Sequence, residues 1–157
     1  MTSRTPRLSL AVLAVLALSA CSAAAGADEA SPGTGGMIEM AISEACTDGS
    51  DAQCVSVNGT SVLLPSGFEV AGVRDSSVSE DGQNMVDVTF DKDGAEVFHA
   101  LTEKAVGAGD SARLVIKIGG ELQAAVLVME ALKGDQAQIG LSPDVSAKEI
   151  VDLIRAG

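Results

Sequence analysis

Polar and apolar residues alternate in several short segments, and this pattern predicts the strands of a β-sheet with one face in solvent. Within 85–90, three apolar side chains alternate with polar ones, which is the two-residue period of a strand buried on one face. A looser alternation covers 37–42, and a further strand fits 136–141. We expect 73–78 to pair with 85–90 across the polar connection 79–84.

A first β-hairpin is predicted around Asn58-Gly59. This dipeptide separates the apolar segments 55–57 and 60–64, and it supplies the two positive-φ positions of a type I′ turn. With Thr60 the same residues also match an N-glycosylation sequon, which the turn explains without a sugar.

A second hairpin is predicted from 113–118 and 121–129, joined by Gly119-Gly120. A two-residue turn there sets Ile116 opposite Gln123 and so mixes polar with apolar side chains on one face. Its register is therefore open, and either a β-bulge or a sheet covered on both faces accounts for the pattern.

Two helices are predicted from helical spacing and capping signals. Asp93 and Glu96 have capping-box spacing, and Gly107 is the expected end of that helix. The inward residues are Val97, Phe98, Leu101 and Ala105. Ser146 and Glu149 form a second capping box before a closing helix with Ile150, Val151, Leu153 and Ile154. Together the elements predict an α+β domain: an antiparallel sheet with two helices packed on one face.

The N-terminus has the organisation of a bacterial export leader. Arg4 and Arg7 precede an apolar run over 8–18, which fits a signal core and is too short to span a bilayer as a helix. The stretch 18–21, Leu-Ser-Ala-Cys, resembles a lipobox, in which the cysteine is acylated and becomes the new N-terminus. We therefore expect Cys21 to carry a lipid anchor of palmitate-like acyl chains. The alternative is an ordinary secreted protein cut near Ala25 or Ala27.

These assignments divide the chain into three parts. Residues 1–20 are the predicted lipoprotein signal peptide, and 21–36 are the lipidated cysteine and a flexible tether of small residues. Such a tether spans on the order of 20 Å as a coil. Residues 37–157 are one domain, and we expect it to be held outside the cytoplasm on the cell membrane.

The charge of the processed chain excludes one class of partner. Cleavage removes two of the ten basic residues and none of the 22 acidic ones, which leaves a net charge near −14. The remaining Lys and Arg residues are scattered singly, whereas nucleic-acid binding needs them clustered. We expect no nucleic-acid partner. The three aromatic residues, Phe68, Phe90 and Phe98, are expected in the core.

Cys46 and Cys54 are the cysteines that remain after lipidation of Cys21. An even pair in an exported protein predicts a disulfide, and no histidine lies nearby to complete a metal site.

Other candidate sites fail on spacing or context, so we expect no cofactor, no metal and no enzymatic activity. His99 is the only histidine, which leaves nothing for a triad or a metal cluster. Residues 107–112 imitate a dinucleotide fingerprint, but a helix precedes them and a strand follows, the reverse of the required order. Asp91 and Asp93 lack the further ligands of a calcium loop and suit a helix start.

The order of motifs in the second half carries a family resemblance. Residues 86–98 (VDVTFDKDGAEVF) are followed by 113–122 (RLVIKIGGEL), by 134–139 (GDQAQI) and by the ending 153–157 (LIRAG). This order resembles the head subdomain of the first periplasmic domain of SecD and SecDF, membrane components of bacterial protein export. Ala124-Ala125-Val126 departs from the Ser-Ala-Pro-like stretch of that family.

The leader, the lack of a catalytic site and the resemblance together predict a non-enzymatic, lipid-anchored module that contacts exported or unfolded polypeptide or translocation components at the membrane. Strand addition to a sheet edge is one route to such contact. The mature chain has no apolar run long enough to span a bilayer, so we expect no proton-driven motor activity from it alone. The alternative is a small-ligand-binding or envelope scaffold lipoprotein unrelated to export. An apolar pocket lined by 114–129 is expected for a ligand binder, and a filled core for a scaffold.

Overall fold

The computed structural model describes residues 35–47, 49, 51–81 and 83–157. The predicted leader, Cys21 and almost all of the tether lie outside these residues. Within the described part the chain forms eight strands and two helices. They are β1 (Gly36–Glu44), β2 (Cys54–Val57), β3 (Thr60–Leu63), β4 (Glu69–Val78), β5 (Met85–Phe90), α1 (Lys92–Ala108), β6 (Ala112–Ile118), β7 (Glu121–Val126), β8 (Gln136–Gly140) and α2 (Ala147–Ala156).

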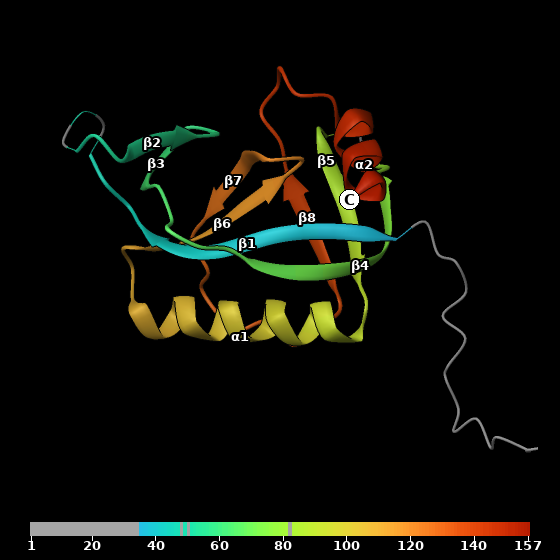
Figure 1. Cartoon of the computed structure of the whole chain (residues 1–157), viewed down its shortest axis with the longest axis horizontal. Helices are drawn as coiled ribbons and strands as arrows, with labels where there is room; N and C mark the ends of the chain where they lie inside the picture. The colour runs from blue at the N-terminus through green and yellow to red at the C-terminus, as the bar shows by residue number, and fades with distance from the viewer. Residues whose placement is uncertain (1–34, 48, 50, 82) are drawn as a thin grey trace, which may run out of the picture. The chain divides into compact units, whose positions relative to one another are not determined.

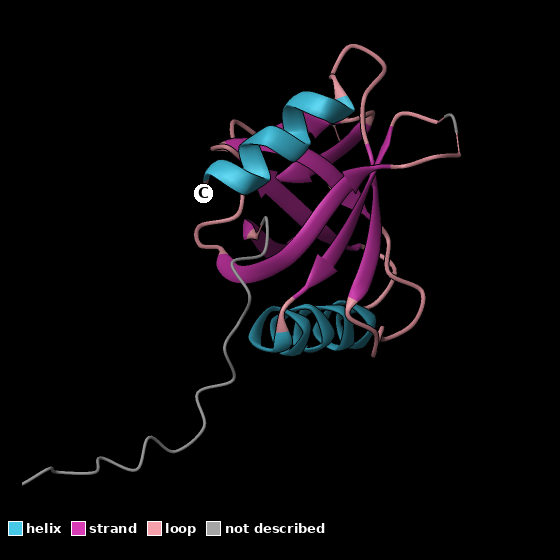
Figure 2. Ribbon diagram, turned by 90° about the vertical axis from the view of Figure 1, so that its right-hand side faces the viewer, coloured by secondary structure: helices cyan, strands magenta, loops and turns pink. Residues whose placement is uncertain are grey.

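Six strands form one antiparallel sheet in the order β7-β6-β1-β4-β5-β8. The sheet is strongly curled, and its strands run between α1 and α2 (Figures 1 and 2). The hairpin β2–β3 forms a separate two-stranded sheet. The first strand of the fold therefore becomes a central one, and β7 and β8 become the two edges.

One apolar cluster joins both helices to the same face of the sheet, as the hydrophobic pattern predicts. Ile38, Met40, Val88 and the other inward strand residues pack with Leu101 of α1 and Ile154 of α2. Phe90 and Phe98 stack in this core with ring centroids 4.9 Å apart. The predicted α+β fold with two helices on one sheet face is confirmed.

The opposite face of β6 and β7 is also buried, because the hairpin β2–β3 covers it. Val115 and Ala125 lie under Val57 and Val62 in a second, smaller cluster. Phe68 belongs to the margin of this cluster rather than to the main core as predicted, and the ammonium of Lys117 lies 4.4 Å from its ring centroid.

The structure settles the register of the β6–β7 hairpin. Gly119 and Gly120 form the two-residue turn, with Ile118 opposite Glu121. A bulge between Ile116 and Lys117 then places Ile116 opposite Ala124 instead of Gln123. Both expected solutions therefore occur together, since the strand pair is bulged and covered on both faces.

The ends of α1 differ from the sequence-based prediction. The N-cap is Asp91, whose carboxylate accepts a hydrogen bond from the Gly94 amide at 2.7 Å, so the predicted cap Asp93 lies in the first turn. The helix passes Gly107 and ends at Gly109, which has the positive φ of 89° that favours glycine. Which aspartate caps the helix depends on how the preceding strand leads into it. The spacing of residues in the sequence does not carry that information.

Smaller differences concern the second helix and two strands. Ser146 is the N-cap of α2, as predicted, but its side chain makes no capping hydrogen bond. Leu153 is 38% exposed rather than inward. The strand β4 begins at Glu69, earlier than predicted, and β7 ends at Val126.

Candidate functional site

An apolar groove lies between the two edges of the curled sheet. Its volume is about 410 Å³. β7 and the loop after it form one side, β8 forms the other, and inward side chains of α1 and β6 form the base. The sheet has not closed into a barrel, and both of its unpaired edge strands border the same opening.

The backbone of β8 is available along this groove. Leu141 donates its amide to Asn84, and Asp135 accepts from the Phe90 amide, so the odd-numbered residues of β8 direct their peptide groups towards β5. Alternate residues of an antiparallel strand direct these groups to opposite sides. Gln136, Gln138 and Gly140 therefore direct theirs away from β5, and all three line the groove.

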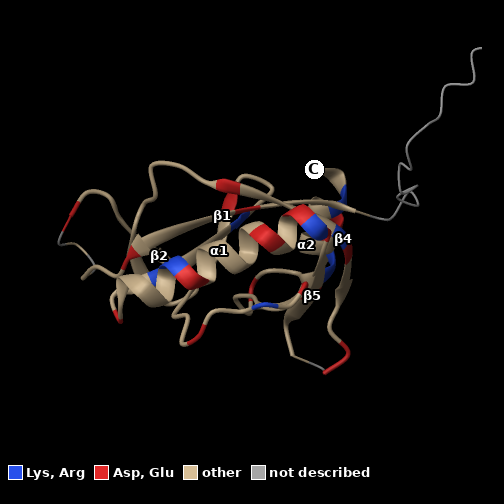
Figure 3. Ribbon diagram, turned by 90° about the horizontal axis from the view of Figure 1, so that it is seen from below, with Lys and Arg blue, Asp and Glu red and all other residues tan. Residues whose placement is uncertain are grey.

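The lining is apolar and contains one charged residue, Glu130. Leu127 and Leu132 are about two-fifths exposed, and Met129 is 80% exposed. Elsewhere charged residues are frequent, and Figure 3 shows acidic and basic positions interspersed along α1. A groove with a single charged residue on a domain this acidic is suited to an apolar ligand, and the unbranched Met129 side chain adapts to different shapes.

One end of the groove is fixed to α1 through Leu132. Its amide donates to the hydroxyl of Thr102 at 3.0 Å, and its carbonyl lies 3.0 Å from Nδ1 of His99. A carbonyl oxygen can only accept, so Nδ1 of His99 is the donor. His99 therefore holds the loop between β7 and β8, a structural role in line with its predicted place on the flank of the helix.

The other end of the groove meets the tip of the β2–β3 hairpin. Asn58 and Gly59 have positive φ values of 47° and 78°, as the predicted turn requires. The side-chain amide of Asn58 donates to the Gly140 carbonyl at 3.2 Å, and its oxygen accepts from the Ser142 hydroxyl at 3.0 Å. Both strands of the hairpin contact β7, and its tip contacts β8 through Asn58.

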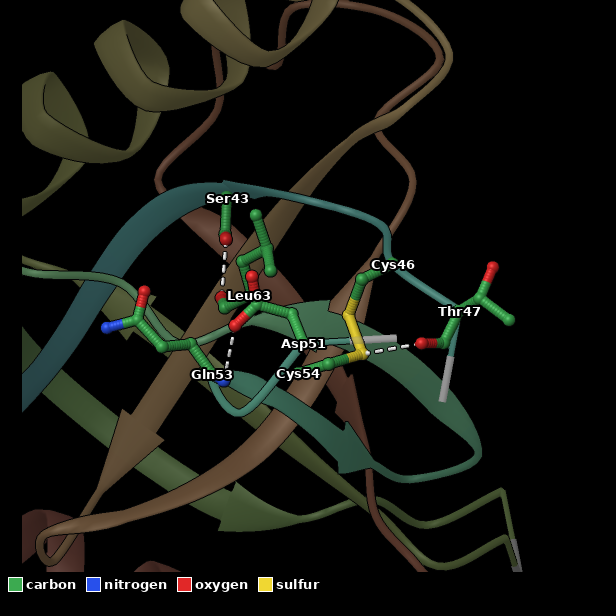
Figure 4. Close-up of a disulfide and its surroundings, with 7 residues drawn as sticks. All are labelled: Ser43, Cys46, Thr47, Asp51, Gln53, Cys54 and Leu63. Carbon is green, nitrogen blue, oxygen red and sulfur yellow. Dashed lines mark hydrogen bonds between the residues drawn. A yellow bond between two sulfur atoms is a disulfide. The ribbon is translucent and has the colours of Figure 1, made fainter. Parts of the chain in front are cut away.

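The predicted disulfide between Cys46 and Cys54 is present at the base of this hairpin. It joins the segment after β1 to the first residue of β2 (Figure 4). Nearby, Ser43 donates its hydroxyl to the Leu63 carbonyl, and Ala45 forms an isolated bridge with Val62. These contacts attach both strands of the hairpin to β1.

The other candidates from the sequence do not assemble into a chemical site. Asp91 caps α1, and residues 107–112 run from the last turn of α1 to the first residue of β6. Within the described residues, no three His, Cys, Asp or Glu side chains are grouped so as to hold a metal ion. Cys21, the predicted lipidation site, lies outside the described residues. No helix in the described part of the chain is long and apolar enough to cross a membrane.

Fold and groove together define the class: a curled antiparallel α+β domain with two free strand edges around one apolar opening. The family model of the SecDF P1 head subdomain matches residues 43–157. The chain therefore belongs to the SecDF P1 head subdomain family, which confirms the resemblance seen in its motifs. Membership of this periplasmic head subdomain family implies an extracytoplasmic location.

A solved structure described as a membrane component SecDF that enhances protein export has a similar fold. The TM-score is 0.50 at 20% sequence identity, and the match covers 78% of this chain and 63% of that one. This chain therefore spans less than two thirds of that structure. No curated protein matches the sequence.

Sequence reasoning located the segment that forms one side of the groove but not the groove itself. An apolar pocket lined from Leu114 to Met129 was one of two expected outcomes, and the groove has that lining on one side. The contribution of β8 was not foreseen, because β7 and β8 face each other only through the curl of the whole sheet. The one sequence signal for the groove is the run of apolar residues after β7, which is unusual for a solvent-exposed loop.

Proposed function

We propose that this protein is a non-enzymatic, lipid-anchored module that binds extended apolar segments of exported or unfolded polypeptide outside the cytoplasm. The binding site is the groove between β7 and β8, and the anchor is the acylated Cys21. The observation that carries the proposal is the meeting, within the described residues, of the two edge strands of the sheet at one largely apolar opening.

An extended peptide matches this groove in two respects. Its backbone finds partners on the outward peptide groups of Gln136 and Gln138, as in other cases of strand addition. Its apolar side chains contact Leu127, Met129 and Leu132 on the opposite wall. Backbone pairing is independent of sequence, which suits a module that meets many different exported chains.

A small apolar ligand is the competing occupant, since the groove lining also meets the expectation for a ligand binder. The strand edges favour a peptide, because a compact ligand has no row of amides and carbonyls to pair with β8. The two occupants predict different effects of proline, which removes a backbone donor and disrupts strand pairing.

The test uses a short dye-labelled peptide of alternating valine and threonine and a second peptide in which every threonine is proline. Fluorescence anisotropy is expected to show binding of the first peptide only. The double variant Leu127→Ser, Met129→Ser is expected to weaken binding at least about tenfold, because each side chain loses apolar contact worth about 1 kcal/mol or more.

The matched control is Leu64→Ser, Met37→Ser, which removes the same two residue types from exposed positions outside the groove. This control is expected to bind as the unchanged protein does. Equal binding of both peptides, or equal loss in both double variants, argues against strand addition at this groove. Turnover of ester or peptide substrates by the purified domain contradicts the non-enzymatic assignment.

The proposed partners are tested in the cell. A photo-crosslinking residue placed at Met129 of the full chain is expected to capture nascent secreted polypeptide or translocation components. The same residue placed at Met37 serves as the control. Capture of neither class at position 129 contradicts the export-related role.

A further inference from the structure

The hydrogen bond from Asn58 to Gly140 occupies a position that an added strand requires. Gly140 is the last residue of β8, and its carbonyl is directed away from β5, towards the groove side. An incoming strand pairs with successive outward peptide groups, here those of Gln136, Gln138 and Gly140. The Asn58 side chain has already taken the third of these acceptors.

The hairpin tip is held in this position from two directions. Ser142, two residues beyond Gly140, donates its hydroxyl to the Asn58 side-chain oxygen at 3.0 Å. The backbone of Ser142 is itself fixed, since its carbonyl accepts from the Asn84 side chain at 2.7 Å. At the other end of the hairpin the disulfide fixes the start of β2.

Gly140 is not required by packing within this chain. A methyl group added to its Cα meets nothing within 4 Å, and its φ does not lie in the left-handed region. Glycine in a strand often marks the close approach of another backbone. The residue is thus placed where a second chain can approach once the Asn58 side chain has moved.

We infer that Asn58 caps the β8 edge and limits the length of polypeptide strand that docks there. In the capped state the groove offers Gln136 and Gln138, and release of Asn58 from Gly140 adds a third pairing residue. The inference rests on the proposed function of the groove and concerns its regulation. The cap also hinders pairing of this edge with other chains, and natural proteins commonly block the edges of their sheets for this purpose.

The experiment compares the unchanged protein with Asn58→Asp and Asn58→Gly. Asp-Gly and Gly-Gly both support a type I′ turn, so the hairpin is expected to be retained. Neither a carboxylate nor a glycine can donate a side-chain hydrogen bond to the Gly140 carbonyl. The second variant removes the donor without adding a charge. Ser56→Ala, at an exposed position of β2, is the matched control that keeps the cap.

Amide hydrogen exchange is measured residue by residue by NMR, with and without the valine-threonine peptide. In the unchanged protein and in Ser56→Ala, the peptide is expected to protect the amides of Gln136 and Gln138 but not that of Gly140. In both Asn58 variants the Gly140 amide is expected to be protected too. Affinity is expected to rise roughly threefold to tenfold, from the usual net strength of one neutral hydrogen bond.

The outcomes separate the cap from the proposed function. Two results overturn the inferred cap but leave peptide binding in place. One is protection of the Gly140 amide in the unchanged protein, and the other is no increase in Gly140 protection or in peptide affinity in either variant. Weaker peptide binding in both variants also overturns it, since Asn58 is then a contact rather than a competitor. Peptide protection at none of the three amides in any protein overturns the proposed function and the cap together. Unchanged exchange in β1 and β4 verifies that the variants are folded.

Discussion

At the scale of single residues, a restrictive contact is the crossing of α1 and β4 at two glycines. A Cβ at Gly94 would stand 2.1 Å from the Gly72 carbonyl oxygen, and a Cβ at Gly72 would overlap the carboxylate of Asp91. The Asp91 amide donates to that same Gly72 carbonyl at 3.0 Å. The start of α1 can therefore lie this close to β4 because both positions are glycine.

A pair of glycine substitutions in α1 tests this contact. Gly94→Ala is expected to destabilise the domain by about 1–3 kcal/mol, because the methyl group meets backbone that cannot easily move. Gly107→Ala lies in the same helix with nothing within 4 Å. It is expected to stabilise by about 0.4–1 kcal/mol through the lower entropy of the unfolded chain.

The measurement is urea unfolding followed by circular dichroism, with each variant compared with the unchanged domain. Opposite signs for the two substitutions are the expected result. Stabilisation by Gly94→Ala to the same extent as by Gly107→Ala would mean that ordinary helix propensity dominates and that the crossing is looser than described.

At the scale of elements, the β2–β3 hairpin is the part that depends most on its attachments. A two-stranded hairpin alone is at best marginally stable in water. Here it is held by the disulfide at its base, by the small apolar cluster with Val115 and Ala125, and by the contacts of Asn58 at its tip. The rest of the sheet has its own apolar core, so we expect it to stay folded when the hairpin loosens.

Removing the disulfide is therefore expected to loosen the hairpin more than the domain. In Cys46→Ser, Cys54→Ser, loss of this short loop closure costs about 2–3 kcal/mol. Amide exchange at Val57 and Val62 is expected to accelerate markedly, while that at Ile38 and Val88 in the main core changes little.

Reduction of the unchanged protein with dithiothreitol serves as the control, since it is expected to reproduce the effect and to leave the double variant unaffected. Uniform acceleration across both clusters would show that the hairpin and the main sheet unfold as one cooperative unit.

At the scale of the whole molecule, the relevant feature is a strongly acidic chain with an apolar groove and a predicted lipid anchor. Its acidity repels anionic membrane surfaces, so we expect membrane attachment to require the predicted acyl chains on Cys21. Two or more acyl chains are sufficient for stable attachment, whereas one is not. In the proposed function, the predicted tether keeps the domain near the membrane, where it would meet exported polypeptide.

The anchor is tested by Cys21→Ser in the full chain expressed in a bacterial host. The unchanged protein is expected in the membrane fraction, with an N-terminus at Cys21 that carries acyl chains by mass spectrometry. The variant is expected to lose acylation and membrane retention. Ser22→Ala is the control and is expected to behave as the unchanged protein. An unmodified N-terminus near Ala25 or Ala27 would identify an ordinary secreted protein instead.

Local chemistry was sufficient to predict most elements of the fold. The Asn58-Gly59 turn, the alternation in β5 and the apolar spacing of α1 and α2 depend on neighbours in the chain, and the structure confirms them. The true cap at Asp91 was missed because Asp93 has equally good spacing. Only the contact with Gly72 distinguishes the two.

The sequence by itself determined the α+β class, the family, the pairing of Cys46 with Cys54 and the acidic, singly scattered charge. These follow from short-range patterns, from the order of motifs along the chain and from composition. Only the tertiary structure decided the bulged register of β6 and β7, the meeting of β7 and β8 at one groove, and the contact of Asn58 with Gly140. These features depend on how far the sheet curls, a property of all six strands packing on two helices together, and no local stretch of sequence encodes it.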